Sequence, residues 1–105
     1  MTEAEFFTKD SVITGVHVFG HTGYAEEGED IVCAAVSSAV IMTANTLTEI
    51  MNVNAEAYDS DGDISITVPC ENAEQCSNVL QGLKLHLLGL EQQYSEFIKV
   101  KFTEV

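Results

Sequence analysis

The alternation of apolar and polar side chains predicts a β-hairpin at the start of the chain. Residues 3–7 and 12–20 read as two strands, and the polar stretch between them has the right length for a hairpin turn. In the second strand, a period of two puts Ile13 and His17 on one face and Val16 on the other. The sequence therefore predicts that Ile13 and His17 share an environment.

The longest apolar stretch covers residues 31–44, and good helix formers continue to about Met51. Asp30 is a suitable N-cap, so a helix of about five to six turns is predicted. Its apolar residues occur on nearly every side through Ile41, which places it between other elements or at a subunit interface. The apolar stretch falls short of the roughly 20 residues that a bilayer crossing needs, so no membrane span is expected.

Three more strands are predicted in the second half of the chain. Residues 54–58 and 64–68 flank the acidic segment 59–63, which is expected to be a turn rather than a calcium loop because its glycine is misplaced and a distal glutamate is missing. Residues 98–103 alternate between apolar and polar side chains, a pattern typical of a strand with one wet face.

A second helix is predicted to begin at Asn72, with Gln75 completing a capping box, and to end near Gln92. One apolar stripe along it would face the core; its members are Cys76, Val79, Leu80, Leu83 and Leu87. The order ββαββαβ predicts an α+β fold, in which a sheet of about five strands carries two long helices. The whole chain, residues 1–105, is expected to form a single domain.

Charge limits the choice of partners. Seventeen acidic residues against four lysines give a net charge of −13, which disfavours binding to nucleic acid or to an anionic membrane and favours a basic partner. The amino-terminal ten residues lack the features of a signal peptide, and three cysteines are a poor basis for a disulfide framework. We therefore expect a cytoplasmic protein with reduced thiols.

The candidate chemistry consists of His21 at a strand end and Cys33 at the start of the first helix. With Asp30 as N-cap, Cys33 occupies the third helical position, where unpaired amides and the helix dipole favour a thiolate. His21 is placed to accept the thiol proton and later to protonate a leaving amine. The alternative role for Cys33 is that of a small buried hydrophobe, and the acidic residues among 22–29 oppose the thiolate form.

Neighbouring residues have two possible roles each. Asp30 either caps the helix or orients His21, and capping is the favoured interpretation. Ser37 lies one turn after Cys33 on the same face, where its hydroxyl supports the site or bonds to a backbone carbonyl. Amides near Cys33 are candidates for an oxyanion hole.

Other readings of the polar residues have less support. A zinc site from His17, His21 and Cys33 would occupy the thiolate needed for attack and lacks a recognised close-spaced motif. Cys70 and Cys76 would pair only in an oxidising compartment, and Cys76 is expected in the core instead. A non-enzymatic dimeric module that holds a basic partner is the remaining alternative function.

The stretch that contains these residues resembles the signature of the ribosomal-processing cysteine proteases of the Prp family, found in Firmicutes and related bacteria. It reads Gly20-His21, then Tyr24, then Gly28 and Asp30-Ile31-Val32-Cys33-Ala34-Ala35-Val36-Ser37. The resemblance implies a catalytic dyad of His21 and Cys33, with Gly20, Asp30 and Ser37 at other motif positions. It implies chemistry that needs neither a cofactor nor a metal ion.

The same resemblance implies a substrate and an assembly. The family removes a short amino-terminal extension from the precursor of ribosomal large-subunit protein twenty-seven, after a hydrophobic segment rich in phenylalanine. It also implies a homodimer and a flexible loop over residues 22–29. Many members have alanine directly after the histidine, whereas this chain has Thr22. That departure bears on fine substrate preference.

Overall fold

A computed structural model describes residues 1–20, 29–60 and 63–105 of the chain. The described elements follow in the order β1 (Thr2–Lys9), β2 (Val12–Phe19), α1 (Glu29–Asn45), η1 (Thr46–Ile50), β3 (Glu56–Ser60), β4 (Asp63–Thr67), η2 (Cys70–Asn72), α2 (Ala73–Gln93) and β5 (Ile98–Glu104). The predicted ββαββαβ order and the α+β fold class are confirmed.

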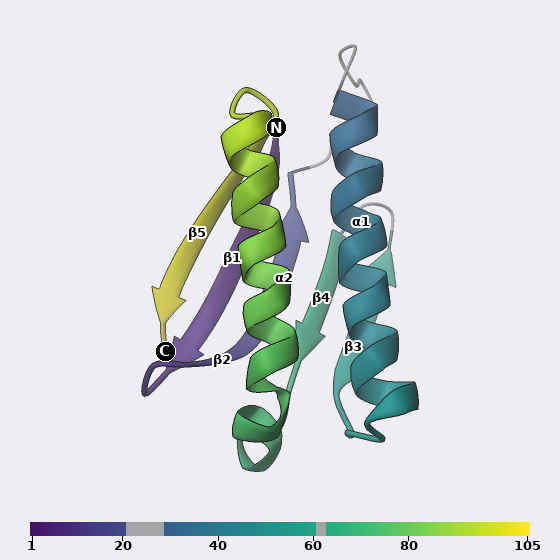
Figure 1. Cartoon of the computed structure of the whole chain (residues 1–105), viewed down its shortest axis with the longest axis vertical. Coiled ribbons are helices and arrows are strands. Elements are labelled where there is room, and N and C mark those ends of the chain that lie inside the picture. Colours follow the sequence, from purple (N-terminus) through teal and green to yellow (C-terminus); the bar gives the residue numbers. More distant parts are fainter. Residues whose placement is uncertain (21–28, 61–62) are drawn as a thin grey trace.

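Within the described residues the strands form one five-stranded sheet in the order β3-β4-β2-β1-β5. Strand β1 pairs antiparallel with β2 on one side and parallel with β5 on the other. Figure 1 shows α1 and α2 side by side on the same face of this sheet, with α1 over the β3 and β4 side. The molecule therefore has two layers, and the outer face of the sheet carries no helix from the described ranges.

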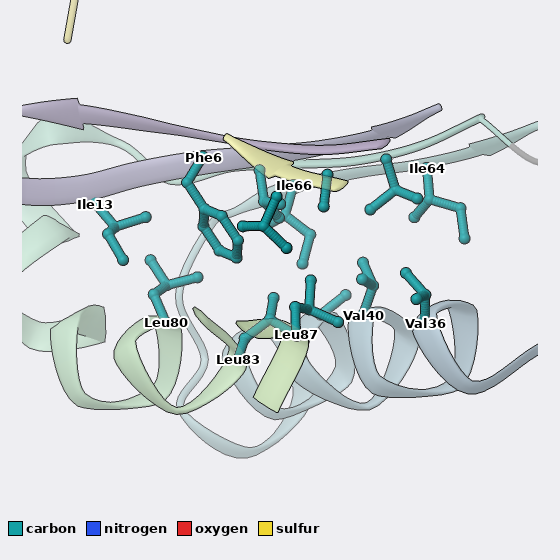
Figure 2. Packing of buried hydrophobic residues seen from close by; sticks show 14 of the residues in the cluster. Phe6, Ile13, Val36, Val40, Ile64, Ile66, Leu80, Leu83 and Leu87 are labelled. Carbon is teal, nitrogen blue, oxygen red and sulfur yellow. The ribbon is translucent and has the colours of Figure 1, made fainter. Parts of the chain in front are cut away.

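The hydrophobic core lies between the sheet and the helices. Figure 2 shows apolar side chains of the strands pointing toward those of both helices. Burial of one such side chain stabilises the fold by about 1.5–3 kcal/mol. The predicted stripe of α2 is confirmed, since its members are buried or pack against the buried cluster. The labelled contacts involve Phe6, Ile13, Ile64 and Ile66 from the sheet, Leu80, Leu83 and Leu87 from α2, and Val36 and Val40 from α1.

The hairpin turn is tighter than the sequence suggested. Strand β1 continues to Lys9 and β2 begins at Val12, so two residues make the connection. Asp10 and Ser11 both have positive φ angles, of 53° and 68°. Such a pair matches the right-handed twist of the flanking strands, which is why two-residue hairpins favour it.

A bulge in this hairpin corrects the predicted facing of Ile13. The pairing register shifts between Phe7 and Thr8, which leaves Thr14 as an extra residue on β2. Ile13 therefore turns inward and is buried on the same side as Val16. The predicted shared face for Ile13 and His17 is wrong, because strict alternation does not survive an inserted residue.

The first helix is longer than the apolar stretch that predicts it. After Asn45 it continues through the π-helical turn η1 to Ile50, giving a helical run of 20 residues from Ile31. This run is long and apolar enough to cross a membrane by length and composition, a test that core helices of soluble proteins also pass. Its sheet-facing residues Val32, Val36 and Leu47 are fully buried in the core.

The predicted capping box of α2 is wrong. The side chain of Asn72 makes no hydrogen bond to the backbone of the first turn. Its Nδ2 instead donates to Oε1 of Gln75 at 3.1 Å. The preceding 3-10 turn η2 leads into the helix, with the amide of Asn72 donating to the carbonyl of Pro69. The 3-10 turn, with its backbone hydrogen bond, thus precedes the helix in place of the predicted capping box.

Candidate active site

The elements that carry Gly20 and Cys33 meet at one end of the two-layer fold. Strands β1 and β5 begin there, β2 ends there, and α1 starts there, close to the N label in Figure 1. Strand pairing brings Glu3 opposite Phe19, so the first residues of the chain lie beside the last residues of β2. This arrangement places the segment that leads to His21 near the amino terminus of the chain.

Cys33 is half-buried on α1 and is not part of a disulfide bond. The helix as described begins at Glu29, so Cys33 is its fifth residue rather than the third. At that distance the unpaired amides of the helix start lie before it, and the dipole effect has weakened. A sequence pattern does not fix the first residue of a helix to better than one or two positions.

Sequence reasoning missed the residue that contacts this thiol. The Thr2 hydroxyl oxygen lies 3.0 Å from the Cys33 Sγ, and either atom can donate the hydrogen bond. Thr2 is only 2% exposed, on the inward face of β1 that continues with Ala4 and Phe6. The alternation of β1 predicts an inward Thr2, but nothing in the sequence links it to a cysteine 31 positions away.

Gly20, which precedes His21, is held against the amino terminus. Its φ angle is +91°, a backbone conformation that residues other than glycine rarely adopt. A Cβ added there would lie 2.6 Å from the Met1 carbonyl oxygen. The motif glycine therefore has a structural reason, since it allows the end of β2 to approach the first residue of the chain.

Several predicted features lie outside the described part of the chain. They are His21, residues 22–28 of the predicted loop, and residues 61–62 of the predicted turn. Asp30 is the second residue of α1, so it lies inside the helix and not at the N-cap position that the sequence predicts; its side chain is outside the described part. Ser37 is half-buried one turn after Cys33, as the spacing predicts.

The zinc reading that included His17 does not fit the fold. His17 pairs with Ser65 of β4 and points to the outer face, where its Nε2 lies 2.6 Å from Oδ1 of Asp63. Its ring stacks on Phe19 with centroids 4.8 Å apart. Cys33 is on a helix over the opposite face, so the sheet separates it from His17.

The other cysteines differ sharply from Cys33. Cys70 is exposed in η2, while Cys76 is fully buried on the core side of α2, as predicted. Neither belongs to a disulfide. Burial raises the pKa of the Cys76 thiol, because desolvation penalises the thiolate. Among the three thiols, Cys33 combines partial exposure with a polar partner on a neighbouring element.

The chain is similar in sequence to a known protease family. The family model described as "Cysteine protease Prp" matches residues 1–99. The ribosomal processing cysteine protease Prp of Staphylococcus aureus is 28% identical over 94 residues, which are 86% of this chain and 87% of the relative.

Solved structures share the fold over its full extent. A Streptococcus mutans protein of 26% identity superposes with a TM-score of 0.82, covering 100% of this chain and 96% of that one. The S. aureus ribosomal processing protease Prp, solved in complex with a substrate peptide, gives a TM-score of 0.89 at 24% identity. That comparison covers 98% of this chain and 100% of the other.

Proposed function

Because this chain belongs to the cysteine protease Prp family, we propose that it is an endopeptidase that removes the short amino-terminal extension of ribosomal large-subunit protein twenty-seven. The observation that carries the proposal is the match of the family model to residues 1–99. A relative of the same fold was solved with a substrate peptide, which supports a peptide as the ligand of this site. The net charge of −13 supports a basic protein substrate.

In the proposed mechanism Cys33 is the nucleophile and His21 the general base and acid. The imidazole accepts the thiol proton, and the sulfur attacks the scissile carbonyl. When the tetrahedral intermediate collapses, the peptide C–N bond breaks and the imidazolium gives its proton to the leaving amine. Water then attacks the thioester, and His21 accepts one of its protons. The C–S bond breaks, the carboxylic acid product departs, and the imidazolium returns its proton to the Cys33 sulfur.

The remaining motif residues support this chemistry without touching the scissile bond. Gly20 lets the strand end approach Met1 and so sets the point from which His21 departs. Asp30 places a negative charge in the first turn of α1, where the helix dipole favours it, and Ser37 contributes a hydroxyl one turn after the sulfur. Unpaired amides at the start of α1 are suited to stabilise the oxyanion. The mechanism requires no cofactor or metal ion.

The proposal includes a homodimer in the cytoplasm. No charged residue occurs between Ile31 and Thr48, and this part of the helix presents Ile41 and the 69% exposed Met42 to solvent, with the 75% exposed Ile50 just beyond it. A second copy could pack against this apolar face without burying a charge. We refer to Ile31, Ile41 and Met42 as the outer face of α1; Glu49 lies between this face and Ile50.

The decisive experiment incubates the purified protein with the full precursor of ribosomal protein twenty-seven and follows its length by mass spectrometry. We expect a shortened product whose formation is lost in Cys33→Ala and in His21→Ala, because each variant lacks one half of the dyad. Cys70→Ala is the matched control, since that thiol is exposed but lies in η2.

The outcomes separate the proposed protease from a binding module. Processing that persists in Cys33→Ala would rule out Cys33 as nucleophile. Tight binding of the precursor without cleavage by the parent protein would favour the non-catalytic dimeric module. A loss of processing in Cys33→Ala with retained precursor binding is the result that the protease predicts.

A further inference from the structure

The amino-terminal dipeptide contacts both segments that carry the proposed dyad. The Met1 carbonyl abuts Gly20, the residue before His21, and the Thr2 hydroxyl lies 3.0 Å from the sulfur of Cys33. These contacts join three parts of the chain that are distant in sequence. The first two residues are therefore in a position to fix the nucleophile relative to the strand end.

Thr2 is itself held firmly by the sheet. Its amide donates to the carbonyl of Phe97 at 2.9 Å, and its Cα pairs with that of Ile98 in β5. Strand β1 lies between β2 and β5, so its start is braced on both sides. A β-branched side chain also has few χ1 rotamers to choose from. The hydroxyl thus meets the sulfur with little loss of conformational freedom.

A hydroxyl at this position is unexpected on packing grounds alone. The inward positions that follow on β1 are Ala4 and Phe6, both fully buried. Valine has the same shape as threonine and would avoid the cost of burying a hydroxyl. The polar atom is accommodated because the Cys33 sulfur is its hydrogen-bond partner.

We infer that Thr2 is a positioning residue for Cys33, whose hydroxyl donates a hydrogen bond to the attacking sulfur. A thiolate has no proton, so in the reactive form the hydroxyl must be the donor. Hydrogen bonds to a charged partner are stronger than neutral ones, so this contact holds the sulfur most firmly when the sulfur carries the attacking charge. Because Cys33 is the fifth residue of α1, a local donor adds to the weakened field of the helix start.

The inference deepens the proposed function and rests on Cys33 being its nucleophile. It is tested with Thr2→Val, which removes the hydroxyl and keeps the shape, and Thr2→Ser, which restores a hydroxyl. Thr43→Val is the matched control, because Thr43 is also buried, on α1, but its hydroxyl donates to the Ala39 carbonyl at 2.8 Å. Stability is followed by urea denaturation.

The readout is the rate at which iodoacetamide modifies Cys33 across the pH range, resolved by mass spectrometry with exposed Cys70 as internal reference. In Thr2→Val we expect a loss of roughly 3- to 10-fold in this rate near neutral pH that disappears at alkaline pH, where a solvent-accessible thiol is ionised with or without a donor beside it. Thr2→Ser should recover most of the rate, and Thr43→Val should match the parent protein.

An unchanged pH profile in a folded Thr2→Val variant would overturn the inference. So would an equal loss in Thr43→Val, because that would indicate a general effect on packing. Cleavage of the precursor is measured on the same samples, and kcat should fall more than KM changes. A parent protein that fails to cleave would overturn the proposed function, while the alkylation profile would still decide the role of Thr2.

Discussion

The three cysteines carry the same chemical group in three different environments. Cys70 is exposed, Cys33 is half-buried beside a threonine hydroxyl, and Cys76 is fully enclosed by the core. Water and hydrogen-bond donors stabilise a thiolate, and an apolar enclosure disfavours it. Reactivity along this chain is therefore decided by what surrounds each sulfur.

Cys76 should make the fold sensitive to alkaline pH. Its pKa is raised from the ordinary value of 9.0, so above about pH 9 the unfolded chain loses this proton more readily than the folded one. The unfolded state then binds fewer protons, and the free energy of unfolding falls as pH rises. The contribution is fully present below pH 9 and is lost above it.

Urea denaturation of Cys76→Ala under reducing conditions checks this linkage. Near pH 7 we expect the variant to be less stable by about 1 kcal/mol, because a buried sulfur is removed. At about pH 10.5 this difference should shrink, because ionisation of Cys76 in the unfolded state lowers the free energy of unfolding of the parent protein only. A difference that stays constant or grows would contradict the assigned cause.

At the scale of elements, the site depends on the meeting of β1, β2 and α1 at one end of the sheet. Gly20 follows the last residue of β2 and lies against Met1. Thr2 is the first residue of β1 and contacts Cys33. Each contact joins an element end to a neighbouring element. The active-site geometry is therefore sensitive to backbone changes at element ends, even where no proposed catalytic side chain is altered.

Gly20→Ala tests the close approach of β2 to the amino terminus. The added methyl group would collide with the Met1 carbonyl at a positive φ angle, and we expect a loss of about 1–3 kcal/mol in unfolding free energy together with reduced cleavage. Gly82→Ala is the control, since it lies in α2 with nothing within 4 Å and should stabilise the helix by up to about 1 kcal/mol. Equal stability of both variants would contradict the strain argument.

At the scale of the whole molecule, the two layers leave different surfaces. The outer sheet face carries polar contacts such as His17 with Asp63, and Lys101 with Glu3 at 3.2 Å. The outer face of α1 is apolar and uncharged up to Glu49. This contrast makes the helical side, rather than the sheet side, the better surface for self-association.

Sedimentation of Met42→Glu tests the proposed homodimer. A charge in the middle of the outer face of α1 would be buried without a partner, so we expect the variant to sediment as a monomer at concentrations where the parent protein is a dimer. Leu85→Glu on α2 is the control, because Leu85 is similarly exposed at 71%. A monomeric parent protein, or a Met42→Glu variant of unchanged mass, would contradict the proposed interface.

The sequence by itself determined the order of elements and most of the core. Alternation in β4 and the spacing of Leu80, Leu83 and Leu87 in α2 are local patterns that follow from strand and helix periods. The glycine, histidine and cysteine spacing likewise identified the family that the match over residues 1–99 confirms.

The tertiary structure decided what depends on contacts between distant residues. The bulge at Thr14 reversed the facing of Ile13, and the hydrogen-bonded turn of η2 replaced the predicted cap at Asn72. The pairing of Thr2 with Cys33 has no sequence signal, because it arises only when β1 and α1 pack together. Local patterns indicate which side chains face inward only where a strand or helix is regular, whereas the partner that each one meets is set by how the layers pack.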